Sequence, residues 1–247
     1  MAAPEKTSSR KNEAALLPAL HGYIEGYYGR LLDWDDRARL LHRLSSLGLN
    51  AYLYAPKEDV CHRFEWRKPW DKDWLTSFSR FCKEAQQYDV CVLGGLAPGL
   101  DYDTYDDAAE FARLLAKAQQ LQDSGAHALV LMFDDIDEPP TGSYGPDGLP
   151  DHALHADIAA RLAEQLDAAV LITPRVYADE MSYDPASHYR NLSAALPTDM
   201  LLFHCGSHIV AGADPLAAST SLARQHISQR LILWDNIYCN DYCPRRL

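Results

Sequence analysis

The sequence predicts an α/β fold, a TIM-type (β/α)8 barrel that stops after its seventh strand. Short apolar runs alternate with amphipathic stretches along the chain, which is the pattern of βα units around a parallel sheet. The runs are almost continuously apolar, as expected for strands covered on both faces. The first run leads into EGYYGR rather than the GxGxxG turn of a dinucleotide-binding sheet. A closed barrel is therefore favoured over an open, doubly wound sheet.

Seven runs are assigned to strands because each is short, apolar and followed by polar or turn residues. A short buried helix would give a similar pattern. The predicted strands are GYIEGYY (22–28), AYLYA (51–55), VCVLGGL (90–96), ALVLMF (128–133), AVLIT (169–173), MLLFH (200–204) and LILWD (231–235).

The helices between these strands carry start and stop signals. Asp33 can cap the helix DWDDRARLLHRLSSLG, and Gly48 can end it in a left-handed turn. In Asp184-Pro185 and Asp214-Pro215, an N-cap residue precedes a first-turn proline. Three more helices are expected over about 71–88, 104–124 and 151–166. The apolar stripe of the first helix consists of Leu40, Leu41, Leu44 and Leu47.

The domain organisation follows from this alternation. Residues 1–18 are polar and lack a pattern, so a flexible N-terminal tail is expected there. Residues 19–247 are predicted to form one barrel domain that lacks its last βα unit. Because such a barrel leaves two strand edges unpaired, we expect weak stability or self-association through the open edge. The Gly/Pro-rich segment 138–150 follows the fourth strand and is expected to be an active-site loop.

Composition restricts the class of partner. A formal net charge of −12 and a pI near 5.2 disfavour binding to a phosphate backbone, so no nucleic-acid partner is expected. The N-terminus lacks the apolar stretch of a secretion signal, and no run reaches the 18 or more apolar residues of a membrane span. A cytoplasmic protein without a membrane partner is therefore expected, and its six scattered cysteines are expected to be reduced.

Polar residues follow the apolar runs, at the strand ends where barrel enzymes place their working groups. The segment LMFDDID puts Asp134 and Asp135 at the end of the fourth strand. Crowding of like charges there is expected to raise at least one carboxyl pKa, as an acid and base pair requires. The same acids are also compatible with solvated loop residues, or with a Mg²⁺ site completed by Asp137 and Glu138. Lys57 is equally compatible with a surface charge.

Six ordered segments together resemble glycoside hydrolase family 84, the family of O-GlcNAcases and their bacterial relatives. They are GYIEGYYGR (22–30), NAYLYAPKEDVCHRFEWR (50–67), APGLDYD (97–103), LMFDDID (131–137), TPRVY (173–177) and LWDNIYCNDY (233–242). The resemblance covers about residue 20 to the end. It implies a barrel and a retaining β-N-acetylglucosaminidase acting on protein-linked or other β-linked GlcNAc, with no cofactor and no catalytic metal.

The resemblance implies substrate-assisted catalysis, in which the substrate's own 2-acetamido oxygen closes onto the anomeric carbon to form an oxazoline. Asp134 would orient and polarise the acetamido N–H group. Asp135 would protonate the leaving oxygen and then activate water. Gly26 would offer its carbonyl to the sugar, and Lys57 would donate to a ring hydroxyl.

Further matches complete the implied substrate site. Tyr177 would hydrogen-bond in the acetamide region, and Trp234 would line the pocket with an aromatic face. Asn236 would help hold the acetamido and catalytic groups, and Asp241 would accept hydrogen bonds from the 4- and 6-hydroxyls. Where the family usually has Trp-Thr-Gly, this chain has His204-Cys205-Gly206, so the pocket wall that includes Cys205 is expected to differ.

Two further functions stay open. A truncated, catalytically impaired homologue could bind GlcNAc-bearing partners without hydrolysing them. A Mg²⁺-dependent barrel enzyme of unrelated chemistry is also compatible with the acids after the fourth strand.

Overall fold

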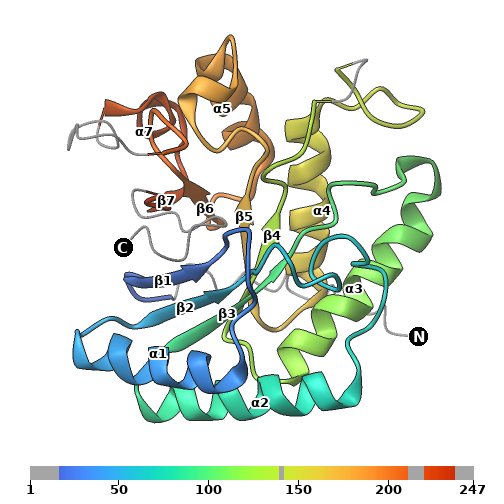
Figure 1. Cartoon of the computed structure of the whole chain (residues 1–247). Helices are drawn as coiled ribbons and strands as arrows, with labels where there is room; N and C mark the ends of the chain where they lie inside the picture. Colours follow the sequence, from blue (N-terminus) through green and yellow to red (C-terminus); the bar gives the residue numbers. More distant parts are fainter. Residues whose placement is uncertain (1–16, 139–141, 211–219, 237–247) are drawn as a thin grey trace, which may run out of the picture.

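The computed structural model describes residues 17–138, 142–210 and 220–236. They form a seven-stranded sheet in which all neighbouring strands are parallel and their order follows the chain (Figure 1). The strands are β1 (Gly22–Glu25), β2 (Ala51–Tyr54), β3 (Cys91–Leu96), β4 (Ala128–Met132), β5 (Ala169–Thr173), β6 (Leu201–His204) and β7 (Arg230–Leu233).

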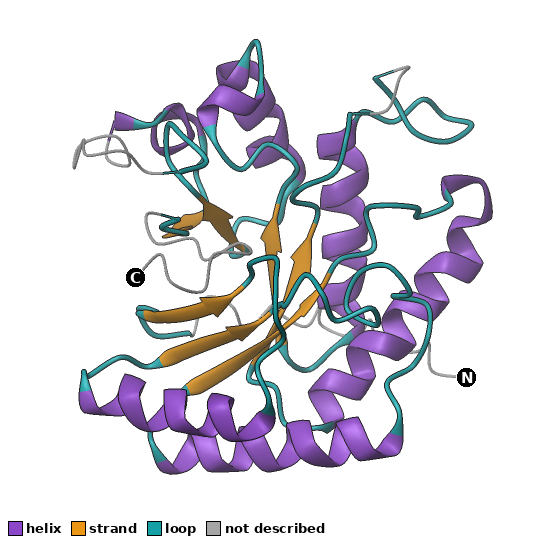
Figure 2. Cartoon of the chain, in the orientation of Figure 1, coloured by secondary structure: helices purple, strands orange, loops and turns teal. Residues whose placement is uncertain are grey.

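Helices lie on the outer side of this curled sheet, between successive strands (Figure 2). Right-handed crossovers through helices are the usual way to join parallel neighbours. The helices are α1 (Trp34–Ser46), α2 (Lys72–Gln87), α3 (Asp107–Asp123), α4 (Asp151–Gln165), α5 (Pro185–Ala195) and α7 (Leu222–His226), with 3-10 turns η2 (Thr104–Asp106) and η3 (Asp179–Met181).

The predicted fold class is confirmed: the sheet is an incomplete TIM barrel with β1 and β7 as its edges. Within the described residues, no strand pairing joins β7 to β1. The chain entering β1 nevertheless contacts β7, because Arg230 donates from Nη2 to the carbonyl oxygen of Leu17 at 3.0 Å. The segment before β1 therefore reaches the β7 edge.

Local sequence signals explain where several helices begin and end. The carboxylate of Asp33 accepts from the backbone N–H of Asp36, and Asp71 and Asp184 cap α2 and α5 in the same way. Gly48 has φ of +70°, a conformation that glycine adopts without a Cβ clash. The predicted caps at Asp33 and Asp184 and the left-handed turn at Gly48 are confirmed.

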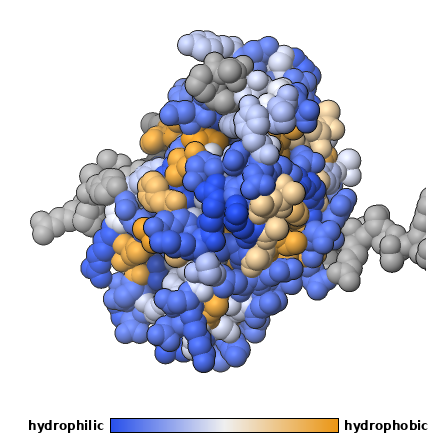
Figure 3. All heavy atoms as spheres, turned by 90° about the vertical axis from the view of Figure 1, so that its right-hand side faces the viewer, coloured by the Kyte–Doolittle hydropathy of each residue, from blue (hydrophilic) through white to orange (hydrophobic). Residues whose placement is uncertain are grey.

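Apolar side chains form a core on each side of the sheet. One cluster lies inside the curl and includes Leu53, Val130 and Leu171; the other lies between the sheet and the helices. Alternation of side chains along each strand supplies both clusters. The face where α3 and α4 lie is mostly hydrophilic, with apolar residues in small separate groups (Figure 3). No helix among residues 17–138, 142–210 and 220–236 has the length and apolarity needed to cross a bilayer.

The structure corrects two details. The first strand ends at Glu25 rather than at residue 28, since the chain turns out of the sheet at GYYGR. Leu47 does not join the apolar stripe of α1: it is the C-cap residue and is 68% exposed, whereas Leu41 and Leu44 are buried. The predicted helix start at Asp214-Pro215 lies outside the described residues.

Candidate active site

A small pocket of about 120 Å³ opens at the carboxyl ends of the strands. Parallel strands bring their carboxyl ends to one rim, so residues far apart in sequence meet there. Seven of the residues predicted from the sequence line this pocket: Gly26, Asp134, Asp135, Tyr177, Cys205, Trp234 and Asn236.

Both acids of the DD pair reach the pocket although they are neighbours in the chain. Consecutive side chains of an extended strand point to opposite faces. The chain leaves β4 just before Asp134, and Asp135 has φ of +56°, in the left-handed region. This turn brings the Asp135 carboxylate to the same side as that of Asp134.

Asp134 is buried and paired with Lys57. Its Oδ2 accepts a hydrogen bond from Lys57 Nζ, while its Oδ1 is buried without a hydrogen-bond partner. A buried carboxylate oxygen without a partner is costly in the free protein. The Asp134 Oδ1 atom is therefore available to a donor on a ligand.

Asp135 is more accessible and is held by two phenols. Tyr177 Oη donates to its Oδ1 at 2.8 Å, and Tyr28 Oη donates to its Oδ2 at 3.1 Å. Lys57 Nζ lies 3.3 Å from Oδ2. Burial alone would raise the carboxyl pKa, but the charge of Lys57 and these hydrogen bonds outweigh it, so the pKa of Asp135 lies below its usual value.

For Asp135, this direction is the opposite of the rise that was expected for at least one acid of the pair. For Asp135, the Lys57 ammonium group compensates for the neighbouring negative charge. Burial opposes charge on Lys57, but Asp134 and Asp135 outweigh it and raise the pKa of Lys57. With 1% of its surface exposed, Lys57 is not a surface charge.

Gly26 and Trp234 form one wall together. A Cβ atom at Gly26 would lie 2.5 Å from Cζ2 of Trp234, so the indole can occupy this place only beside a glycine. Trp234 also packs edge-on against Phe203, with ring centroids 6.1 Å apart. Contacts with Gly26 and Phe203 thus fix the position of Trp234 in the pocket wall.

Cys205 and Asn236 form the adjoining wall. Asn236 donates from Nδ2 to the carbonyl oxygen of Ile209 at 3.0 Å and lies 3.6 Å from the Cys205 sulfur. In the HCG segment, Cys205 alone lines the pocket, since His204 turns to Tyr189 of α5, with Nε2 3.1 Å from Oη. Cys205 is therefore the residue through which the expected difference in this wall would reach the pocket.

Four further residues belong to the site and were not predicted from the sequence. Tyr28 and Thr173 line the pocket, and the buried Thr173 hydroxyl has no hydrogen-bond partner. Arg63 donates to Tyr28 Oη at 2.6 Å and to the Asp135 carbonyl oxygen at 2.7 Å. Burial, with the charge of Lys57, lowers the pKa of His62 to about 4, and His62 Nδ1 lies 2.9 Å from the carbonyl oxygen of Gly95. Tyr28 and Thr173 end the predicted strands 22–28 and 169–173, and this position at a strand end was the signal that could have identified them.

Some predictions do not reach the pocket. Asp241 lies outside the described residues. The described part of the predicted active-site loop, residues 138 and 142–150, contributes no residue to the lining. Among the described residues, the four acids considered for Mg²⁺ do not gather into one ligand cluster, and Lys57 occupies the cation position beside Asp134 and Asp135.

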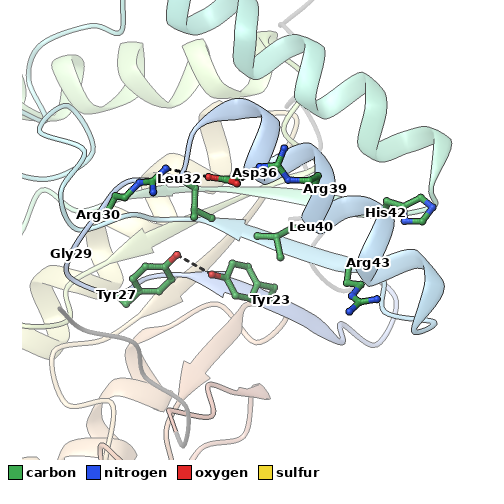
Figure 4. A pocket seen from close by; sticks show the side chains of 10 residues that line it. All are labelled: Tyr23, Tyr27, Gly29, Arg30, Leu32, Asp36, Arg39, Leu40, His42 and Arg43. Atoms are coloured by element: carbon green, nitrogen blue, oxygen red, sulfur yellow. Dashed lines mark hydrogen bonds and ion pairs between the residues drawn. The ribbon is translucent and has the colours of Figure 1, made fainter. Parts of the chain in front are cut away.

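A larger hollow of about 710 Å³ lies between the outer side of β1 and α1 (Figure 4). Tyr23 and Tyr27 meet there through their hydroxyls, 3.0 Å apart, and Leu40 faces them from α1. Its one carboxylate, Asp36, is paired with Arg30 and Arg39. The acid pair thus belongs to the smaller pocket, while this hollow marks the open β1 edge of the barrel.

Comparison with known proteins identifies the family and the fold. Residues 21–247 match the family model described as beta-N-acetylglucosaminidase. Protein O-GlcNAcases of Rattus norvegicus and Mus musculus are each 28% identical over 235 residues, which is 92% of this chain. The chain spans only 25% of the length of these relatives. A solved structure of a Thermobaculum terrenum O-GlcNAc hydrolase mutant superposes with a TM-score of 0.78 at 23% identity, covering 90% of this chain and 48% of that one.

Proposed function

The chain belongs to the beta-N-acetylglucosaminidase family, glycoside hydrolase family 84, and from this we propose that it hydrolyses β-linked N-acetylglucosamine with retention. Protein-linked GlcNAc is the substrate we favour, because the curated relatives are protein O-GlcNAcases. The observation that carries the proposal is the pair Asp134 and Asp135 in one pocket with Tyr177, with the buried Lys57 paired to both acids behind the lining.

In the first step, the acetamido oxygen of the substrate attacks the anomeric carbon as the bond to the leaving oxygen breaks. Asp134 accepts a hydrogen bond from the acetamido N–H through the Oδ1 atom that lacks a protein partner. This contact stabilises the positive charge that develops on the forming oxazoline. Asp135 transfers its proton to the leaving oxygen.

In the second step, a water molecule attacks the anomeric carbon and opens the oxazoline ring. The Asp135 carboxylate takes the water proton, which restores its acid form. Sugar binding would also affect the first step: by burying Asp135 and competing for Tyr177, it would raise the low carboxyl pKa and favour the protonated acid.

The test is turnover of aryl β-N-acetylglucosaminides by the purified chain and by the variants Asp134→Asn and Asp135→Asn. Each variant should lose about 10²- to 10⁴-fold in rate, because each removes a charge-stabilising or proton-transferring group. The Asp135→Asn loss should be smaller with a good leaving group, which needs little protonation.

Asp137→Asn is the matched control. Asp137 is an exposed acid of the same segment that does not line the pocket, so its replacement should leave the rate nearly unchanged. Near-parental turnover by both Asp134→Asn and Asp135→Asn would contradict the assigned roles. Equal losses on good and poor leaving groups would contradict the acid role of Asp135.

The open sheet supports a second candidate, a catalytically impaired homologue that binds GlcNAc-bearing partners. Within the described residues, no strand closes the barrel between β7 and β1. Measurable binding of an oxazoline mimic without hydrolysis of any aryl glycoside would favour this candidate. The same open edge leads us to propose that the chain self-associates.

A further inference from the structure

A cluster of metal-ligating side chains lies where α4 and α5 begin, outside the pocket with the acid pair. Asp151 and His152 open α4, and His188 lies in the first turns of α5. Each offers one ligand atom, and the three atoms lie within 4.8 Å of one another. Both histidines have Nδ1 3.8 Å from Asp151 Oδ1.

The surroundings orient the cluster. Arg175 Nε donates to Asp151 Oδ2 at 2.6 Å, which fixes the carboxylate with Oδ1 toward the two imidazoles. Asp151 is 7% exposed, and the buried Nε2 of His188 has no hydrogen-bond partner. The nitrogen of His188 that faces Asp151 Oδ1 is Nδ1, so Nδ1 is the ligand atom and Nε2 is the ring nitrogen left for an outer partner such as water.

We propose that Asp151, His152 and His188 bind a Zn²⁺ ion that braces the start of α4 against the start of α5. Two imidazoles and one carboxylate are a common zinc ligand set that leaves a fourth position for water. Tetrahedral ligands lie about 3.4 Å apart when the metal bonds are near 2.1 Å long. The two separations of 3.8 Å need only a small contraction. The partly exposed His152 can rotate to bring its ligand nitrogen closer to that of His188, since all three ligand atoms already lie within 4.8 Å of one another.

The nature of the ligands favours zinc over Mg²⁺ or Ca²⁺, which prefer oxygen atoms. The guanidinium group of Arg175 weakens the site by its charge, but it contacts the carboxylate oxygen that points away from the histidines.

The zinc site would take no part in the reaction itself. It would instead hold in place the loops after β4 and β5, which lead from the pocket to α4 and α5. Asp151 ends the segment that follows Asp135, and Arg175 is two residues before Tyr177. A metal here ties together the connections after β4 and β5. Cysteines and acids of the catalytic pocket take no part in it, so zinc binding is independent of whether the chain hydrolyses sugars.

The experiment is calorimetric titration of the metal-free whole chain with ZnCl₂, together with thermal unfolding with and without the ion. We expect one site per chain and a higher melting temperature with zinc. His188→Gln and His152→Gln should each weaken binding by at least about tenfold, since even residues that only support ligands cost 10- to 100-fold. His42→Gln, at an exposed histidine of α1, should bind zinc as the parent does.

Three results would overturn the proposal: no zinc binding, unchanged affinity in the two ligand variants, or a thiolate-to-metal charge-transfer band when Co²⁺ replaces zinc. The last would place the ion on cysteines. If the His188→Gln variant unfolds, the zinc affinity of His152→Gln, at the more exposed of the two histidines, decides between the outcomes. Thermal unfolding of His152→Gln and of the parent, both in EDTA, then shows whether the substitution itself affects stability.

Discussion

At the scale of single residues, Asp135 combines a strained backbone with a stabilised charge. A non-glycine residue with φ of +56° costs free energy, which the surrounding contacts must offset. Hydrogen bonds from Tyr28 and Tyr177, and one from Arg63 to the Asp135 carbonyl oxygen, supply such contacts. These contacts fix the direction of the proposed acid before a substrate binds.

Tyr177→Phe tests this arrangement through pH dependence. The Tyr177 hydrogen bond helps to hold the pKa of Asp135 low, so its removal raises that pKa. A general acid must be protonated, and a higher pKa keeps it protonated to higher pH. The alkaline limb of the kcat/KM profile should therefore move to higher pH, while the rate falls by roughly tenfold or more with loss of a hydrogen bond to a charged group.

Tyr105→Phe serves as the control for this measurement. Tyr105 is 78% exposed in η2 and does not line the pocket, so both rate and pH profile should match the parent. A Tyr177→Phe profile whose alkaline limb stays in place, or moves to lower pH, would contradict the acid role of Asp135.

At the scale of elements, a buried ion pair ties α1 to the end of β1. Arg37 donates to both carboxylate oxygens of Glu25 at 2.9 and 2.8 Å, and Tyr52 Oη donates to Glu25 at 2.6 Å. Glu25 thus faces the helix layer although it precedes a residue of the pocket. Its role is to fix the edge strand that carries Gly26.

Arg37→Met should lower the free energy of unfolding by about 3–5 kcal/mol, because Glu25 would remain buried without its charged partner. The side chains of Arg37 and Glu25 are only 5% and 1% exposed. Arg39→Met on the same helix breaks a pair whose arginine is 70% exposed, and should cost at most about 1 kcal/mol. Urea denaturation measures both, and similar losses would refute the structural role of the Glu25 pair.

The sequence was sufficient for the elements and insufficient for the details of the site. Apolar runs located all seven strands, and Asp-Pro and Asp-x-x signals located helix starts, because both depend on neighbouring residues. The sequence did not identify Tyr28, Thr173 and Arg63 as residues of the site. The direction of a side chain at the rim of the barrel depends on the curl of the sheet and on turns such as that at Asp135, which the local sequence does not determine. The low pKa of Asp135 could not be predicted because it depends on Lys57, 78 positions earlier, whose buried Nζ lies 3.3 Å from the Asp135 carboxylate.

At the scale of the whole molecule, the sheet has two free edges, β1 and β7, in the described part of the chain. Free edges present unpaired backbone groups to other chains. Leu233 lies on β7 and is 53% exposed. The β7 edge therefore carries one exposed apolar side chain, Leu233, next to the backbone groups of an edge strand.

Sedimentation velocity over a range of concentrations should show self-association of the parent chain and a shift toward monomer for Leu233→Lys, since lysine on an edge strand opposes pairing. Leu47→Lys is the matched control, at an apolar residue that is 68% exposed and lies at the C-cap of α1 rather than on β7. A monomeric parent chain, or equal effects of the two lysines, would contradict association through the β7 edge.

The order of the strands, identical to their order in the chain, has a consequence for synthesis on the ribosome. A nascent chain emerges from its N-terminus, so each βα unit can dock on a neighbour that is already outside the exit tunnel. Asp134 and Asp135 leave the tunnel about a hundred residues before Trp234 and Asn236. The side chains that complete the pocket wall therefore emerge well after the strand that precedes Asp134 and Asp135.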